Sequence, residues 1–436
     1  MAVRSAQSGR APGGTAAGRV PGRTAAGRGP GGTAAGRGPG GTASLADGWD
    51  VEPELFASLA RHDQRRMAEQ YVRGLLAAEG RKTLRNVAEQ IGGKALQQSV
   101  HHFITASSWN WAPVRSALAR LADEAVRPQA WVVNSTVIPK AGIHSVGVDQ
   151  QFLPHLGQTV NGQRAFGAWS ASERISVPFN WSLVLSRSWL EDPARRSRAN
   201  IPAASRVASL EEHAGSVALE AAEAWGLRRR PVVVDVEGLD AGATAGRFAR
   251  AGASLILRID GATPLRVDGS LLQGYSDKEV PALNLISSMK RMRRQVEWSD
   301  AVGGRLHLGV VSAIPVLLAC RVPGGGSGAV HHRPMLLMGD WRSSDRWPSR
   351  LWLTDSRRLP LTTLLRLTRL TDVVERDFAE ISEQTGVRDF AGRSFQGWHR
   401  HITLASVAHL VAARAGARGF PARRRRAAGS VTPLCA

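Results

Sequence analysis

Two short apolar runs, far apart in the sequence, constrain the fold of this chain most. Residues 131–133 (Trp-Val-Val) and 232–234 (Val-Val-Val) have the large and β-branched composition of buried strands. Asn134 follows the first run directly, and Asp235 follows the second. Each run can therefore carry the polar residue that follows it to the end of a buried strand.

A third segment, residues 362–383, has the period of an amphipathic helix. Val374, Phe378 and Ile381 recur at spacings of four and three residues, and Glu375 lies beside this apolar stripe. A helix that packs on a sheet through this stripe can bring Glu375 to the sheet edge.

The charge balance indicates a polyanionic partner. The 436 residues include 57 Lys and Arg against 36 Asp and Glu, a formal net charge of +21. Such an excess neutralises phosphates and releases counterions, so binding to nucleic acid should weaken steeply with salt. The preference for arginine over lysine has two open explanations, which are bidentate phosphate contacts and a GC-rich coding bias.

Membrane and secreted classes are not expected. The longest apolar run, residues 310–319, is interrupted by Ser312 and Pro315 and is too short for a span of roughly 20 residues. The N-terminus lacks the apolar stretch of a secretory signal, which favours a cytoplasmic, nucleoid-associated protein. Cys320 and Cys435 are isolated and indicate neither a disulfide framework nor a CxxC metal site.

The N-terminal part divides into two regions. Residues 1–45 repeat TAAGR with a period of nine and are expected to be disordered, either as a translated tandem DNA repeat or as a basic arm. Residues 46–128 are expected to be a helical DNA-binding region. Within it, residues 83–91, Gly92-Gly93 and residues 94–103 read as helix, turn and helix, which fits a helix-turn-helix reader or a plain helical hairpin.

The rest of the chain predicts an α/β fold. Residues 129–245 should form the first part of the core and residues 246–358 a β-rich insertion. Residues 359–413 should carry the glutamate helix and a closing helix, and residues 414–436 a basic tail. Core strands are expected at 131–133, 165–170, 179–185 and 232–234, with a helix at 210–225. The insertion should have strands at 254–259, 265–267, 306–311, 316–321, 334–338 and 351–354.

These segments resemble the three acidic blocks of DDE-type insertion-sequence transposases. The most specific piece is GVRDFAGRSFQGWHRH at residues 386–401, with its Gly-Arg-Ser, aromatic, Gly, aromatic, His-Arg-His order. The resemblance implies an RNase H-like core, double-stranded DNA as partner, and a second copy of the chain as a further candidate partner. It also implies cutting and joining of element ends with Mg²⁺ or Mn²⁺.

This resemblance implies that residues 134, 235 and 375 meet at one edge of a single sheet. By it Asp235 and Glu375 are catalytic residues and metal ligands, and Asn134 replaces the first aspartate. Asp149 is a weak substitute candidate. Further departures are Ser382, Thr371-Asp372 and residues 236–239. DNA contacts are expected from Arg393, His399, Arg400, Lys290, Arg291, Arg293 and Arg294. For His399 and His401 a surface or capping role is the alternative, and for residues 290–294 a solvated loop.

Two functions follow as hypotheses. The first is a transposase-like DNA-binding protein whose cleavage is impaired, because a neutral amide lacks the charge that two divalent cations require. The second is a catalytically inactive DNA-binding protein, either a decaying element copy or a domesticated regulator.

Overall fold

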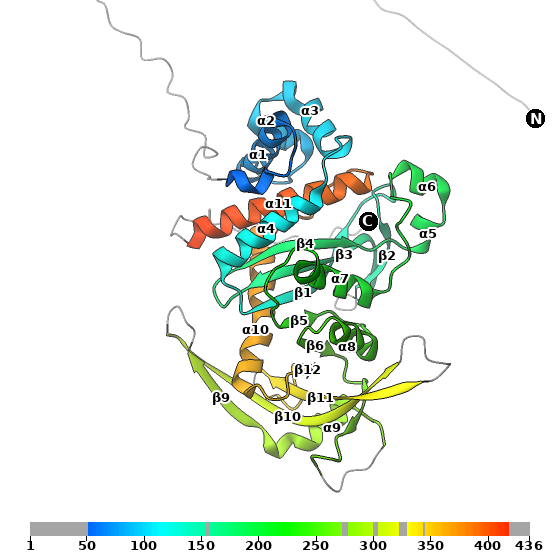
Figure 1. The fold of residues 1–436 in the computed structure, drawn as a ribbon, viewed down its shortest axis with the longest axis vertical. Coiled ribbons are helices and arrows are strands. Elements are labelled where there is room, and N and C mark those ends of the chain that lie inside the picture. Colours follow the sequence, from blue (N-terminus) through cyan, green and yellow to red (C-terminus); the bar gives the residue numbers. More distant parts are fainter. Residues whose placement is uncertain are drawn as a thin grey trace, which may run out of the picture. The chain divides into compact units, whose positions relative to one another are not determined.

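One mixed sheet organises the part of the chain that the structure describes (Figure 1). This computed structural model describes residues 51–153, 157–272, 278–299, 304–321, 329–342 and 345–417, which lie within one compact unit. The strands run in the order β2-β3-β1-β5-β6-β12-β11-β10-β7-β8, with β4 paired to β3 and β9 paired to β10. The predicted α/β class with an RNase H-like core is confirmed.

The strands of the sheet are β1 (Ala130–Pro139), β2 (Val148–Leu153), β3 (Gln158–Ala171), β4 (Ser176–Leu183), β5 (Val232–Asp235), β6 (Leu255–Ile259), β7 (Pro264–Val267), β8 (Val280–Pro281), β9 (Arg294–Ser299), β10 (Leu306–Arg321), β11 (Val330–Trp341) and β12 (Arg350–Thr354). The helices are α1 (His62–Ala77), α2 (Leu84–Ile91), α3 (Lys94–Thr105), α4 (Trp111–Val126), α5 (Arg187–Leu190), α6 (Pro193–Arg198), α7 (Leu210–Glu223), α8 (Ala241–Arg250), α9 (Ala282–Ser288), α10 (Leu361–Asp377) and α11 (Phe395–Ala417). Shorter turns are η2 (Pro53–Phe56), η3 (Met289–Met292) and the π-helical η4 (Phe378–Ser382), which continues α10.

Three neighbouring parallel strands form the centre of the core. β1 pairs in parallel with β5, and β5 pairs in parallel with β6; helix α7 precedes β5, and helix α8 connects β5 to β6. Parallel strands are covered on both faces, so their sequences are continuously apolar, as the valine run of β5 is. The four predicted core strands and the helix at 210–225 are present, but β1 ends six residues later and β3 begins seven residues earlier than predicted.

Alternate side chains of these strands point to opposite faces of the sheet. Val132, Val233 and Ile256 belong to one apolar core, to which α10, α11 and the N-terminal helices contribute. The residues that come directly before and after each of these three in the strand point into a second core beneath α7 and α8. The side-chain period of two in a strand therefore fixes which face each later residue of the strand occupies.

The β-rich stretch continues the core sheet. β6 lies in the range predicted for the insertion, yet it pairs with β5 on one side and with β12 on the other. β12, β11 and β10 then extend the same sheet by antiparallel pairing. The core sheet thus reaches beyond residue 245, and the predicted domain boundaries stay a prediction.

Residues 306–311 and 316–321 form one strand, β10, where two strands were expected. Pro315 lies in its middle and pairs in register with Leu336 of β11. On the other side of β10, pairing with β9 ends at Val311 and pairing with β7 begins at Val316. The prediction of a break was wrong because a missing N–H costs little where no strand pairs on one side.

The predicted helix, glycine turn and helix are present as α2 and α3. Thr83 caps α2 by accepting a hydrogen bond from the Asn86 amide at 3.1 Å. Gly93 has φ of 73° and ψ of −162°, a conformation that essentially only glycine adopts. Val100, Phe103 and Ile104 of α3 are buried, while the opposite side of the helix is polar and exposed.

Buried polar groups attach the N-terminal helices to α11. Arg115 of α4 is buried and donates to Thr403 Oγ1 at 2.8 Å, to the Trp181 carbonyl at 2.6 Å and to His399 Nδ1 at 3.0 Å. Tyr71 Oη lies 2.8 Å from His401 Nδ1. Because a buried polar group without a partner is costly, these bonds specify how α11 packs.

Three histidines of α11 are held neutral by burial. Burial lowers the pKa of His401 and of His409 to about 4, and burial, together with the neighbouring Arg115, lowers the pKa of His399 well below its usual value. The alternative of surface or capping roles for His399 and His401 is therefore wrong, since both side chains are buried in the core.

The repeat at 1–45, the glycine-rich segment at 324–328 and most of the basic tail lie outside the described residues. Among the helices that are described, none is both long and apolar enough to cross a bilayer.

We predict that acid destabilises this fold through these histidines. In the unfolded chain these histidines have a pKa of about 6.5, so below that pH they bind protons, whereas in the folded chain they stay neutral. The free energy of unfolding should therefore fall as the pH is lowered from about 6.5 to about 4. At about pH 5 the loss should be roughly 2 kcal/mol for each of His401 and His409. Urea midpoints at about pH 7 and pH 5 measure it.

The matched variants are His409→Gln, which removes a buried titrating ring, and His101→Gln on the exposed side of α3. The first should flatten the pH dependence and the second should leave it unchanged. Equal stability of the unmodified chain at both pH values would contradict the prediction.

Candidate active site

The register of the parallel strands brings Asn134 and Asp235 side by side. They are partners in the β1–β5 pairing, and both lie on the face that carries Val132 and Val233. α10 packs on this face, in contact with β1 and β5. Its Val374 is buried against the core, and the adjacent Glu375 is exposed beside the pocket. The three positions expected at one sheet edge therefore do meet.

A pocket of about 300 Å³ joins these residues. Its floor is formed by β1 and β5, and its sides by β6, β12, α10 and the segment after η4. The lining residues are Val132, Asn134, Ser135, Thr136, Asp235, Arg258, Arg350, Thr371, Val374, Glu375, Phe378 and Arg388. Asp149 lies in β2, where it pairs with Gly162 of β3, and it does not line the pocket. It therefore does not replace the missing aspartate.

Asn134 is held by an indole. Trp169 of β3 donates from Nε1 to the Asn134 side-chain oxygen at 2.9 Å. The amide oxygen is therefore engaged in a hydrogen bond, and the group carries no charge. It is a poor ligand for Mg²⁺, which prefers anionic oxygen.

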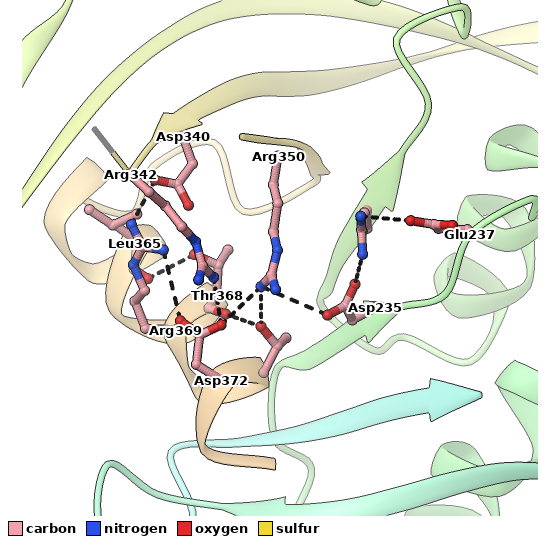
Figure 2. Close-up of polar contacts among 11 residues, drawn as sticks. Asp235, Glu237, Asp340, Arg342, Arg350, Leu365, Thr368, Arg369 and Asp372 are labelled. Carbon is pink, nitrogen blue, oxygen red and sulfur yellow. Dashed lines mark hydrogen bonds and ion pairs between the residues drawn. The ribbon is translucent and has the colours of Figure 1, made fainter. Parts of the chain in front are cut away.

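Asp235 is paired with two arginines. Arg258 Nη1 lies 2.9 Å from Asp235 Oδ1, and Arg350 Nη1 lies 3.9 Å from Oδ2. Figure 2 shows Arg350 reaching from β12 between Asp235 and Asp372 of α10. Both carboxylate oxygens of Asp235 thus face a guanidinium group.

The register of β6 explains the position of Arg258. Val234 pairs with Leu257, so the next pair along the two strands is Asp235 and Arg258. Arg258 lies two residues after Ile256 and hence on the same face of the sheet. Its second nitrogen also binds Glu237 at 2.7 Å.

A balanced ion-pair network surrounds Asp235 (Figure 2). Arg350 also donates to Thr371 Oγ1 at 2.7 Å and to Asp372 at 3.2 Å. Arg342 and Arg369 bind the carboxylates of Asp372 and Asp340. The network comprises four arginines (Arg258, Arg342, Arg350 and Arg369) and four carboxylates (Asp235, Glu237, Asp340 and Asp372). It is therefore neutral as a whole.

Glu375 is the carboxylate of the pocket without a partner. Among the described residues its side chain forms neither an ion pair nor a hydrogen bond, and it is exposed. Arg388, across the pocket, instead pairs with Glu383 at 2.9 Å and lies over the Phe378 ring.

The pocket does not fit a pair of divalent cations. A site for two cations needs several anionic oxygen ligands. This pocket instead offers a neutral amide, a carboxylate already paired with two guanidinium groups, and one free carboxylate. No group of three or more His, Cys, Asp or Glu able to hold a metal occurs within the described part of the chain. Asp235 and Glu375 as metal ligands stay a prediction that this charge arrangement disfavours.

The departures from the transposase pattern have structural roles here. Ser382, where a phosphate-gripping lysine is usual, is buried and bonded to His409 Nδ1 at 2.8 Å. Thr371 and Asp372 are partners of Arg350. The departures therefore serve the core and the ion-pair network.

The residues predicted to contact DNA fall into separate places. Arg393 is exposed and lines a second pocket. His399 and Arg400 are buried, and Arg400 donates to the carbonyls of Trp109 and Ile104 at 3.1 Å. Direct DNA contact by these two side chains conflicts with their burial, because they attach α11 to the N-terminal helices.

The basic cluster at 290–294 is at the surface. Lys290, Arg291 and Arg294 are exposed, whereas Arg293 lies over the Trp341 ring at 4.2 Å and donates to the Arg346 carbonyl at 2.9 Å. A DNA contact by the three exposed side chains stays a prediction.

Sequence reasoning missed Arg258, Arg350 and Arg388. A signal for the first was present, because an arginine inside the apolar strand run of residues 255–259 needs an acidic partner when it is partly buried. Arg350 and Arg388 follow no such pattern, and only their positions in space bring them to Asp235 and Glu375.

Comparisons with known proteins agree with this architecture. The family of DDE superfamily endonucleases matches residues 54–275, just over half of the chain. A probable transposase for insertion sequence element IS701 from Microchaete diplosiphon is 33% identical over 120 residues, which cover 27% of this chain and 31% of that relative. The chain thus spans about a third of that relative's length.

The family match contains Asn134 and Asp235 and ends before Glu375. Endonucleases of this superfamily generally use divalent metals, which makes the arginine-paired aspartate a departure within the family. The family match, the RNase H-like sheet and the meeting of the three positions in one pocket agree with one another. The chain therefore belongs to the DDE superfamily endonucleases and, within them, resembles the insertion-sequence transposases.

Proposed function

We propose that this protein binds double-stranded DNA as a transposase does, and that its cutting and joining of element ends is abolished or strongly impaired. The observation that carries the proposal is the state of Asp235, whose two oxygens face Arg258 and Arg350 beside the neutral Asn134. A guanidinium group repels the cations that family members use, and it offers no proton acceptor for activating water.

The helical region supports the DNA-binding part of the proposal. The exposed side of α3 carries Lys94, Gln97, Gln98 and His101, while its opposite side is packed on the protein. Lysine suits phosphates, and glutamine can bind an adenine edge in a bidentate way. The formal charge of +21 adds a sequence-independent attraction.

A catalytically inactive regulator is the second candidate function. The neutral ion-pair network favours it, because the charge of Asp235 is already balanced within the protein. Strand nicking separates the two candidates, since both bind DNA.

We predict that Asn134→Asp alone restores little nicking. The new carboxylate stands beside an aspartate that Arg258 and Arg350 still neutralise. Asn134→Asp combined with Arg258→Gln should nick roughly tenfold faster than the single variant, which corresponds to about 1.4 kcal/mol. The assay follows nicking of a supercoiled plasmid that carries the gene and its flanks, with Mg²⁺ or Mn²⁺.

The matched control combines Asn134→Asp with Arg250→Gln, which removes an exposed arginine on α8. It should behave as the Asn134→Asp variant does. Robust nicking by the unmodified chain would refute the impaired function. Rapid nicking by Asn134→Asp alone would show that the missing charge at this position, and not the ion pairs, is the main defect.

For α3 we predict a role in reading sequence. Selection from a pool of randomised duplexes defines the preferred site of the full chain. Gln97→Ala and Gln98→Ala should then lower the preference for that site by roughly 1–3 kcal/mol for each base that the variant no longer reads, with non-specific binding unchanged.

Gln129→Ala, at an exposed residue before β1, serves as control and should bind as the unmodified chain does. If both glutamine variants of α3 keep the full preference, α2 and α3 are a plain helical hairpin.

A further inference from the structure

A second pocket, of about 140 Å³, is lined by basic residues. Its lining is Ile143, His144, Trp189, Arg195, Arg198, Ala199 and Arg393, and it shares none of these residues with the pocket of Asp235. Arginines make up three of the seven lining residues, and no carboxylate lines the pocket. We call it the arginine pocket.

Three chain segments form the arginine pocket. α5 packs on the edge strand β2, because Trp189 Nε1 donates to the Val148 carbonyl at 2.9 Å (Figure 1). The short helix α6 follows, and its end is joined to the start of α11 by a hydrogen bond from the Phe395 amide to the Ala199 carbonyl at 2.8 Å. This bond brings Arg393, two residues before Phe395, to the arginines of α6.

The guanidinium groups of the pocket are only partly neutralised by the residues that the structure describes. Arg195 lies over the Trp189 ring at 5.4 Å and has Asp192 at 3.7 Å. Arg198 donates only to the Ala194 carbonyl, at 3.2 Å, among the described residues. Arg393 forms no ion pair or hydrogen bond with any described residue. One carboxylate thus accompanies three positive charges, in contrast to the neutral network around Asp235.

Asp192 is itself committed to the backbone. Its Oδ1 accepts hydrogen bonds from the amides of Ala194 at 2.8 Å and Arg195 at 3.0 Å, which caps α6. These backbone bonds lower the pKa of Asp192, so the carboxylate form is favoured while Oδ1 is already engaged. The remaining guanidinium donors are therefore open to an external anion.

The size and charge of the pocket select a small anion. Planar guanidinium groups bind phosphate oxygens in a bidentate way. The volume is below the roughly 300 Å³ at which pockets begin to hold drug-sized ligands, so one phosphate group fits and a whole nucleotide does not. Arg198, Arg393 and His144 are exposed at its rim, where a duplex could approach.

We propose that the arginine pocket binds one backbone phosphate of double-stranded DNA, held jointly by Arg198 and Arg393 with Arg195 behind them. This rests on the proposed DNA-binding function and adds a phosphate site that lies apart from the Asp235 pocket. Arg195 is positioned by the Trp189 ring, so its charge is held ready before DNA arrives.

The test measures binding of the full chain to a duplex at several salt concentrations. Arg198→Gln and Arg393→Gln should each lower the slope of log affinity against log salt by about 0.9, the value for one phosphate contact. Because both side chains hold the same phosphate, the double variant should lower the slope by about 0.9 as well, rather than by twice that amount. Arg250→Gln on α8 is the matched control and should leave the slope unchanged.

Two further arms identify the source of the phosphate. Duplexes with and without a 5′-phosphate should bind alike, and inorganic phosphate at matched ionic strength should compete only weakly. If the variants lose affinity only for the 5′-phosphorylated duplex, the pocket holds a chain end and the backbone assignment is overturned.

The outcomes separate this proposal from the proposed function. Salt-dependent binding by the unmodified chain with unchanged slopes in both variants would overturn the arginine pocket and leave DNA binding intact. Absence of duplex binding by the unmodified chain would instead overturn the proposed function and this site with it. Slopes that fall additively in the double variant would show two separate contacts and refute a shared phosphate.

Discussion

The parallel pairing of β1, β5 and β6 is the constraint on which the rest of the structure depends. Its register places Asn134, Asp235 and Arg258 in one row, on the face that α10 covers. A shift of one residue would turn each side chain to the other face, into the core beneath α7 and α8. The apolar strands that fix the register therefore also decide which charges meet.

The two pockets differ in how their charges are balanced. Around Asp235, arginines and carboxylates from β5, β6, β11, β12 and α10 satisfy one another, which ties the extended part of the sheet to its centre. Removing one partner from a buried pair leaves an uncompensated charge, so a single substitution in such a network is expected to lower the stability of the fold. In the arginine pocket the positive charges of the lining exceed the negative ones, which is the basis for the phosphate site proposed there.

The segment with the strongest resemblance to transposases serves mainly to pack α11 against the N-terminal helices. His399, Arg400 and His401 look like phosphate-binding side chains in the sequence, yet all three are buried. Their partners, among them Arg115 and Tyr71, belong to the N-terminal helices. Polar residues at regular helical spacing can therefore mark a buried polar interface, which becomes visible only when the partner helices are placed.

The meeting of residues 134, 235 and 375 was expected from the resemblance to transposases. By itself the sequence determined most of the strands, the amphipathic helices and the glycine turn before α3. These features depend on local periodicity and on rules for covering parallel strands, which are legible in a linear chain. Only the tertiary structure decided that Asp235 is paired with Arg258 and Arg350, and that Arg198 meets Arg393. Charges act through space, and these partners lie far apart along the chain, so no local pattern could assign them.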